Sequence, residues 1–377
     1  MSWPSDMAPE SPRVSVVMAA FNAAPFLRDA IDSILGQTFT DFEFIIVDDG
    51  STDGTAEIIE SYTDPRIRLI RNPGNLGLVA SLNRGLAAAR GEYIARMDAD
   101  DESLSGRLEA QVRFLDTHPE IGLCGTHVQT FGARNEFWTF ECDPKRLRCH
   151  LLFSTGISHP SVMFRRRLVE AHGLTYDPAY PRAQDYDLWV RFAGVTALAN
   201  LPDVLLRYRL HENSLSGTDR SVQDALADEI RRRQLRMIGL EVSDREMFVH
   251  TTLMRGWPRT AEVLVDEAEA WLVRLLEANG RHRLVDQATL TEMLYEMWFK
   301  LCRGHRASLR MPAVRFLRSP IARAMPLLNR SADGARLLAM SRRRILEQPP
   351  ADEAVEITPE AVGADRRADP ARPSQHP

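Results

Sequence analysis

Three carboxylates lie within four residues of one another at the end of an apolar run. Residues 97–101 read MDADD and directly follow a strand-like stretch. Asp98 and Asp100 are two residues apart, so in extended backbone both side chains share a face and can approach one cation. Clustered like charges beside an apolar strand need a hard cation or a basic partner. The pattern predicts a Mg²⁺ or Mn²⁺ site, and a solvated acidic loop is the alternative.

A second acidic segment follows another apolar run. Residues 47–55 read VDDGSTDGT. In open α/β sheets, ligands bind beyond the carboxyl ends of the strands, so these carboxylates can accept hydrogen bonds from a base or a ribose. Asp, Gly, Ser and Thr also form turns and helix N-caps. The segment predicts a nucleotide contact, with a turn and a helix cap as the alternative.

A further carboxylate precedes an amphipathic segment, in the sequence QDYDLW at 184–189. Asp185 is a candidate general base. The alternative is a helix cap, with Asp187 as a first-turn charge. His159 and His211 can belong to a site or can pack as ordinary histidines.

The elements that must position these residues alternate between strand-like and helical runs. The pattern predicts strands at 14–18, 42–47, 67–70 and 93–97, and helices at 26–35, 55–62 and 78–90. Gly91 is expected just beyond the end of the third helix. This alternation indicates an α/β protein with a parallel sheet covered by helices.

Beyond residue 104 the pattern becomes mixed and then helical. It predicts a helix at 108–116, strands near 121–130, 161–164 and 205–210, and long helices at 221–238, 260–278 and 287–302. The last three are each expected to end before a glycine. We therefore expect a flexible arm at 1–12, an α/β domain at 13–215, a helical region at 216–346 and a disordered tail at 347–377.

Charge and hydropathy exclude several classes of protein. The 377 residues carry 47 Lys+Arg and 52 Asp+Glu, a net charge of −5, which offers no overall field for nucleic acid. No apolar run reaches the ~18 residues of a transmembrane helix, and residues 1–12 do not resemble a signal peptide. We expect a cytoplasmic protein that binds no nucleic acid.

Taken together, these residues resemble the inverting glycosyltransferases of family 2, which have the GT-A fold. The resemblance rests on seven segments in family order, at 14–22, 47–53, 75–77, 91–101, 159–163, 185–189 and 208–211. It implies a GT-A-type nucleotide-binding sheet flanked by helices, here followed by a C-terminal helical appendage. It also implies a hexosyltransferase that moves a sugar from a nucleotide-diphosphate sugar to an acceptor hydroxyl, in surface polysaccharide or glycoconjugate synthesis.

The resemblance further implies roles for individual residues. The metal, Mg²⁺ or Mn²⁺, would be held by Asp98, Asp100 and His211. Asp185 would be the catalytic base, and Asp49 would contact the nucleotide base. The nucleotide-sugar contacts as a whole would be Ala20, Phe21, Asn22, Asp49, Asn75, Asn83 and Asp98.

Other functions are weighed against this resemblance. A Rossmann dehydrogenase needs G-x-G-x-x-G after the first strand, where residues 20–25 contain no glycine. A sugar-phosphate nucleotidyltransferase needs a basic, glycine-rich loop near the N-terminus, where only Arg13 and Arg28 lie. A nucleotide-sugar-binding protein without catalysis is the remaining alternative, with Gln184 in place of the family's usual Glu.

An arginine-rich segment at 303–344 interleaves cations with apolar residues. Such a segment can lie on an anionic membrane and bring the enzyme to a carbohydrate or lipid-linked acceptor. Pro312, Pro320 and Pro326 divide it into short pieces. The alternative to peripheral membrane contact is therefore packing of its apolar residues on the preceding helices.

Overall fold

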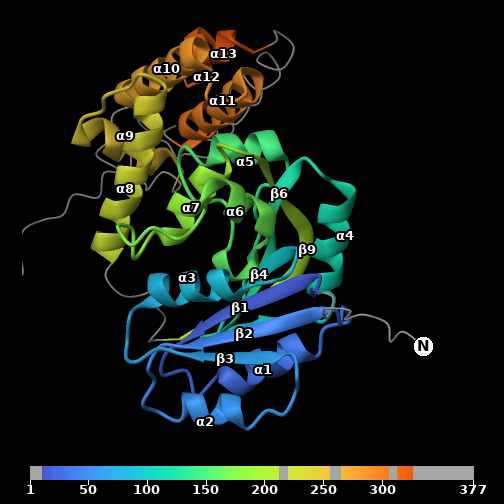
Figure 1. The fold of residues 1–377 in the computed structure, drawn as a ribbon. Helices are drawn as coiled ribbons and strands as arrows, with labels where there is room; N and C mark the ends of the chain where they lie inside the picture. The colour runs from blue at the N-terminus through green and yellow to red at the C-terminus, as the bar shows by residue number, and fades with distance from the viewer. Residues whose placement is uncertain (1–10, 212–219, 255–264, 305–311, 326–377) are drawn as a thin grey trace, which may run out of the picture.

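A central sheet with helices on both faces organises the protein (Figure 1). The computed structural model describes residues 11–211, 220–254, 265–304 and 312–325. The expected tail, residues 1–10 of the expected arm, and much of the arginine-rich segment lie outside these residues. The nine strands follow the order β3-β2-β1-β4-β8-β6-β9-β5, and β7 pairs with β6.

The strands alternate with helices over the first hundred residues, as the sequence predicts. The strands are β1 (Val14–Ala20), β2 (Phe42–Asp48), β3 (Ile67–Arg71), β4 (Tyr93–Asp98), β5 (Glu102–Ser103), β6 (Ile121–Gly132), β7 (Phe137–Trp138), β8 (Met163–Arg165) and β9 (Ala197–Leu210). The α-helices are α1 (Leu27–Leu35), α2 (Thr55–Glu60), α3 (Leu78–Ala88), α4 (Arg107–Thr117), α5 (Pro144–His150), α6 (Arg166–His172), α7 (Gln184–Phe192), α8 (Arg220–Met237), α9 (Asp244–Met254), α10 (Val265–His282), α11 (Gln287–Gly304), α12 (Pro312–Arg318) and α13 (Pro320–Arg323), and a 3-10 turn, η1, covers His159–Ser161.

Strands β1, β2, β3 and β4 are parallel and carry the site at one edge. Ala20 at the end of β1 pairs with Asp48 at the end of β2. On the other side of β1, Ala19 pairs with Asp98 at the end of β4. The loops that follow β1, β2 and β4 therefore leave the sheet at the same edge, which is where ligands of such sheets bind.

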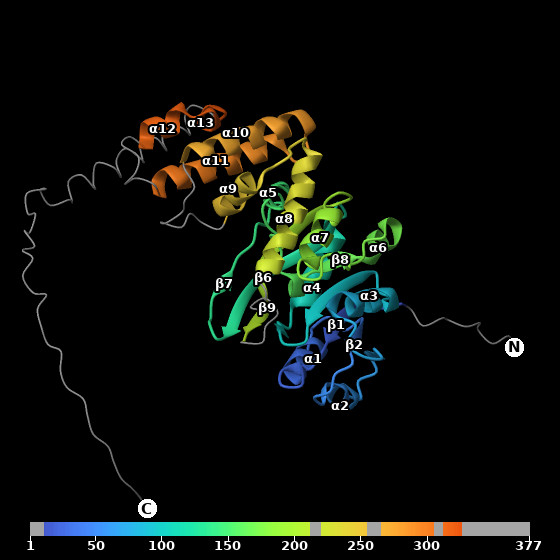
Figure 2. The same cartoon turned by 90° about the vertical axis from the view of Figure 1, so that its left-hand side faces the viewer.

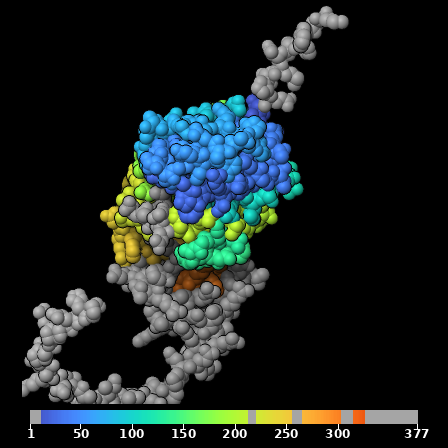
Figure 3. Space-filling view, turned by 90° about the horizontal axis from the view of Figure 1, so that it is seen from below, coloured from blue at the N-terminus to red at the C-terminus, as the bar shows by residue number. Residues whose placement is uncertain are grey.

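The two faces of the sheet are covered by different helices. Val16 and Met18 of β1 pack into a core shared with α1 and α4, whereas Val17 faces the core shared with α3 and α7. Alternate residues of a strand point to opposite faces, so this near-continuous apolar strand serves both layers. Figure 3 shows that α1, α2 and the neighbouring strands form one end of the molecule.

The helices of the C-terminal region gather at the opposite end, above α5 and α7 (Figure 2). Cys149, Leu152 and Phe153 pack in one core with Trp271 of α10 and Trp298 of α11. The helical region is therefore continuous with the α/β part, and the boundary expected at residue 215 stays a prediction. No helix among the described residues combines the length and the apolar character needed to cross a bilayer.

Three glycines do not lie just beyond the ends of helices as expected. Helix α3 ends at Ala88, and a Cβ on Gly91 would lie 2.5 Å from the backbone nitrogen of Ser15. Gly91 thus permits close approach to β1. Gly280 lies inside α10, which continues to His282, and the buried Asn279 just before it hydrogen-bonds to Val285. Gly304 likewise lies within α11.

Candidate functional site

The loops after β1 and β2 are tied together by side chains. Asn22 adopts a positive φ of 48°, which asparagine tolerates better than most residues. Its side-chain oxygen accepts a hydrogen bond from Thr52 N at 2.9 Å, and its own N–H donates to Ser51 Oγ at 3.0 Å. Ala20 is buried, whereas Phe21 is 46% exposed at this edge. The residues expected to line a nucleotide pocket thus belong to one braced loop pair.

Asp49 positions the loop that follows β3. Its Oδ1 accepts hydrogen bonds from Asn72 Nδ2 at 2.6 Å and from Leu76 N at 2.9 Å. Its Oδ2 accepts one from Gly77 N at 2.8 Å. Both oxygens of this buried carboxylate are engaged by the protein, and its contact with a nucleotide base stays a prediction.

Asn75 and Asn83 differ in what they do. Asn75 is exposed in the loop held by Asp49, and its Oδ1 accepts a hydrogen bond from Gly77 N at 3.0 Å. Asn83, on α3, donates to Tyr176 O at 2.8 Å and accepts from Tyr176 N at 2.9 Å. Asn83 therefore anchors the segment before α7, and its contact with a nucleotide sugar stays a prediction.

Three carboxylates meet after β4. Asp98, Asp100 and Asp101 each offer one oxygen, and these atoms lie within 4.8 Å of one another. His211, just beyond β9, places Nε2 2.9 Å from Asp100 Oδ2. Arg209 N donates to Asp101 Oδ1 at 2.9 Å, whereas the buried Asp101 Oδ2 has no partner among the described residues. The predicted metal ligands are thus brought together, with Asp101 as an additional carboxylate.

The electrostatics of this cluster suit a divalent cation. Burial and the charge of Asp100 raise the pKa of Asp98, although Arg96 opposes the shift. Burial and both neighbouring carboxylates raise the pKa of Asp101 well above its ordinary value. Oxygen ligands with excess negative charge and one unpartnered oxygen are the donor set that Mg²⁺ or Mn²⁺ prefers.

A buried arginine that the sequence analysis missed lies behind the cluster. Arg96 is 3% exposed and pairs with Asp98, while its Nε and Nη1 have no partner among the described residues. His159 Nε2 lies 2.8 Å from the hydroxyl of Tyr176. Burial, and then the charge of Arg96, hold the pKa of His159 well below its usual range. The sequence does contain a signal for this residue, because Arg96 is the one charged residue in the otherwise apolar stretch 93–97 and lies two positions before Asp98.

Asp185 lies in the first turn of α7, whose N-cap is Ala183, so it is not the helix cap. Burial raises the pKa of the Asp185 carboxyl. The charges of Arg96 and Asp98 also act on Asp185, in opposite directions. The charge of Asp98 thus raises the pKa of the candidate base, although Asp185 is 87 residues further along the chain.

Helix α7 is fastened to the helical region beside Asp185. The fully buried Asp187 accepts hydrogen bonds from Arg191 Nε at 2.8 Å and from Arg233 Nη2, on α8, at 2.7 Å. Gln234, the next residue of α8, lies 3.2 Å from the hydroxyl of Tyr186. Tyr186 and Asp187, the two residues after Asp185, are therefore both held by α8.

Comparisons with known proteins agree with this geometry. Residues 15–173 match the family model described as glycosyl transferase family 2. An "uncharacterized glycosyltransferase" of Haemophilus influenzae is 32% identical over 248 residues, which cover 61% of this chain and 77% of that protein. Another, of Methanocaldococcus jannaschii, is 37% identical over 218 residues, which cover 55% of this chain and 74% of that protein.

Among solved structures, Staphylococcus aureus TarS in complex with UDP-GlcNAc has the same kind of fold. The TM-score is 0.53 at 16% sequence identity, and the match covers 82% of this chain and 90% of that one. At this identity the likeness is one of fold, and it agrees with the α/β architecture of a GT-A protein.

Proposed function

Since the chain belongs to glycosyltransferase family 2 and is a glycosyltransferase, we propose that it transfers a sugar from a nucleotide-diphosphate sugar to an acceptor hydroxyl, with metal dependence and inversion. The observation that carries the proposal is the acidic cluster of Asp98, Asp100 and Asp101, together with the half-buried Asp185, whose pKa the charge of Asp98 helps to raise. Inverting transfer needs a charge-stabilising group at the leaving diphosphate and a base on the acceptor side.

The donor would bind at the edge where β1, β2 and β4 end. The braced loops there offer the exposed ring of Phe21, and Asn75 in the loop held by Asp49. TarS, which shares the fold, was solved with UDP-GlcNAc, and this supports a donor of the same chemical class. The nucleotide would thus lie across the loops after β1, β2 and β3, which are joined to one another by hydrogen bonds.

Asp98, Asp100 and His211 would hold Mg²⁺ or Mn²⁺, and the unpartnered Oδ2 of Asp101 supports a cation in this cluster. When bound, the cation would stabilise the negative charge that develops on the departing diphosphate. Arg96 orients Asp98 from behind and offsets part of the cluster's charge.

Asp185 would accept the proton of the acceptor hydroxyl as that oxygen attacks the anomeric carbon. Its raised pKa makes it a stronger base than an ordinary aspartate, and its place in the first turn of α7 lets the helix dipole favour the ionised form. Attack from the face opposite the diphosphate is a single displacement, which inverts the anomeric configuration.

The proposal extends to a carbohydrate or lipid-linked acceptor, to surface polysaccharide or glycoconjugate synthesis, and to a cytoplasmic protein with peripheral membrane contact. The basic segment 303–344 is the motivation for membrane contact. Flotation with anionic liposomes at 0.15 M salt tests it. Equal recovery in the soluble fraction of the full chain and of a chain ending before Arg303 would contradict it.

A screen of nucleotide sugars by thermal shift, with and without Mn²⁺, tests the donor site. A true donor raises the melting temperature by mass action, and the rise should depend on Mn²⁺ and on Asp100. Slow hydrolysis of that donor distinguishes an enzyme from a protein that only binds it. If no nucleotide sugar stabilises the protein, the proposed donor site is wrong.

A further inference from the structure

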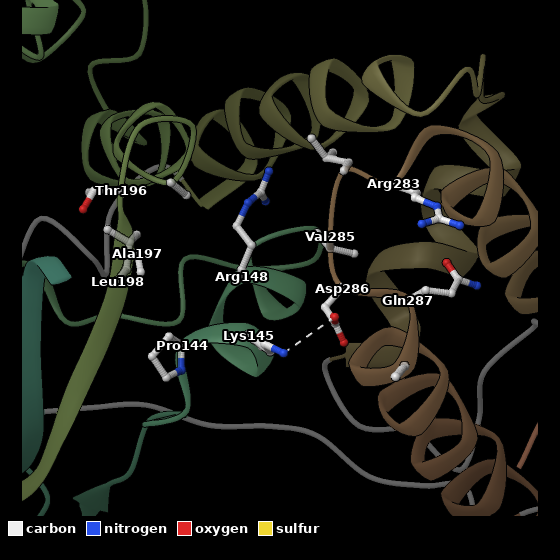
Figure 4. A pocket seen from close by; sticks show the side chains of 13 residues that line it. Pro144, Lys145, Arg148, Thr196, Ala197, Leu198, Arg283, Val285, Asp286 and Gln287 are labelled. Atoms are coloured by element: carbon white, nitrogen blue, oxygen red, sulfur yellow. Dashed lines mark ion pairs between the residues drawn. The ribbon is translucent and has the colours of Figure 1, made fainter. Parts of the chain in front are cut away.

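A pocket lies far from the acidic cluster. It has a volume of about 630 Å³ and opens between α5, the start of β9 and the turn that joins α10 to α11 (Figure 4). Ala197 and Leu198, at its wall, begin β9, whereas His211 lies just beyond the other end of that strand. The pocket is therefore separate from the proposed donor site.

The charges that line this pocket are mostly positive. Lys145, Arg148 and Arg283 supply three cations, and Asp286 supplies the single carboxylate, which leaves an excess of two positive charges. Lys145 Nζ lies 3.8 Å from Asp286 Oδ2, a long contact for an ion pair. Figure 4 shows Arg148 extending from α5 into the space between β9 and the α10–α11 turn.

Arg148 lacks the partner that its neighbour on α5 has. Arg146 binds Glu296 through both terminal nitrogens, at 3.2 and 3.0 Å, and Glu141 through Nε at 2.9 Å. The half-buried Arg148 makes one hydrogen bond in the described part of the chain, to Gln234 Oε1 at 3.4 Å. Burial lowers the pKa of Arg148, and no described carboxylate lies within ion-pair distance of it. A guanidinium held in a pocket without a counter-charge is unfavourable unless an anion occupies the space.

We propose that this pocket binds a phosphorylated organic molecule through Arg148 and Lys145. A phosphate monoester presents several oxygens, which suit both the planar fork of an arginine and the point charge of a lysine. The organic part would lie against the apolar wall made by Ala193, Ala197, Leu198 and Val285. The volume exceeds what a phosphate group alone needs, so the pocket has room for an organic part.

The phosphate ester can come from a soluble metabolite or from the headgroup of a phospholipid. Two probes separate these sources: glycerol 3-phosphate in solution, and vesicles containing phosphatidic acid beside vesicles of neutral phosphatidylcholine. Binding of the soluble probe is measured by thermal shift in EDTA and at constant ionic strength. Because EDTA removes any divalent cation from the acidic cluster, the shift reports on the pocket. Co-sedimentation reports on the vesicles.

Three variants make the test specific. Arg148→Met should weaken binding of the effective probe by about tenfold or more, as expected for loss of a charge-assisted hydrogen bond. Lys145→Gln, at a side chain that is 69% exposed, should weaken it by a smaller factor and keeps the test open if Arg148→Met does not fold. Arg113→Gln, on the exposed face of α4, is the matched loss of one surface charge and should leave binding unchanged.

A soluble probe that stabilises the wild type but not Arg148→Met assigns a metabolite to the pocket. Binding of phosphatidic acid vesicles alone, with the same dependence on Arg148, assigns a lipid headgroup. If neither probe binds, or if all three variants bind as the wild type does, the pocket is not a phosphate site. Donor binding and sugar transfer play no part in this readout, so its failure leaves the proposed function untouched.

Discussion

The imidazole Nε2 of His211 lies 2.9 Å from Oδ2 of Asp100, although the two residues are 111 positions apart. The ring of Phe26, next to α1, packs against His211 with a centroid distance of 4.8 Å. The loops after β1 and β4 therefore meet at one imidazole, that of His211 at the end of β9. The surroundings of the acidic cluster therefore come from three separate segments of the sheet and not from one loop.

We expect Asp100→Ala to reduce sugar transfer by about 100-fold or more, because a charge-stabilising group at the leaving diphosphate is lost. Asp98→Ala should also reduce sugar transfer strongly, but less than Asp100→Ala does. The melting temperature of Asp100→Ala in EDTA should stay close to that of the wild type, since the Asp100 carboxylate is partly exposed. Asp41→Ala, on the surface before β2, is the control. Normal turnover of the Asp100 variant at low Mn²⁺ would show that the metal assignment is wrong.

Asp185→Asn should lower kcat by about 100-fold or more, because the amide keeps the shape of the side chain but cannot accept the proton. Donor affinity, measured by calorimetry, should change little. If donor affinity falls strongly while the rate at saturation is kept, Asp185 is a binding residue and not the base.

The pH dependence of kcat should report the same carboxyl. Burial raises the pKa of Asp185, so protonation inactivates the base at a higher pH than it would an ordinary aspartate. Activity should therefore fall on the acidic side, with a midpoint above the ordinary pKa of an aspartate. Comparison with Asp185→Glu assigns this limb, since the midpoint should move in that variant. An identical acidic limb in both proteins would mean that another group controls it.

Much of this site follows from the sequence because parallel strands end at one edge. The apolar runs at 42–47 and 93–97 are each followed directly by aspartates, so their convergence is predictable without coordinates. The strand boundaries agree with the structure to within about two residues over this region.

Other features depend on packing between distant segments, which local patterns do not encode. The exchange of hydrogen bonds between Asn83 and Tyr176 spans 93 residues, so no local pattern indicates it. Arg96 on β4 lies beside the segment that follows His159, where Val162 O accepts a hydrogen bond from Arg96 N at 2.9 Å. Gly91 is a further example. A Cβ at this position would clash with the backbone of β1, and nothing in the preceding helix indicates that contact.

The link between α7 and α8 gives a stability prediction. Arg233→Met leaves one oxygen of the fully buried Asp187 without its charged partner, which should destabilise the protein by about 3 kcal/mol or more. Arg232→Met is the control, because its ion-pair partner Asp244 is exposed and such pairs contribute about 0–1 kcal/mol. Urea unfolding of both variants measures the difference. Equal losses would show that Asp187 is adequately held by Arg191.

The most direct test of the account is the rate at which the purified protein releases nucleoside diphosphate from its donor sugar, measured with Mn²⁺ and with EDTA. The wild type should release it with Mn²⁺ and not with EDTA, and both Asp100→Ala and Asp185→Asn should be slower by about 100-fold or more. Two results would contradict a metal-assisted transfer with Asp185 as its base: release by the wild type at the same rate in EDTA as in Mn²⁺, or release by either variant at the rate of the wild type.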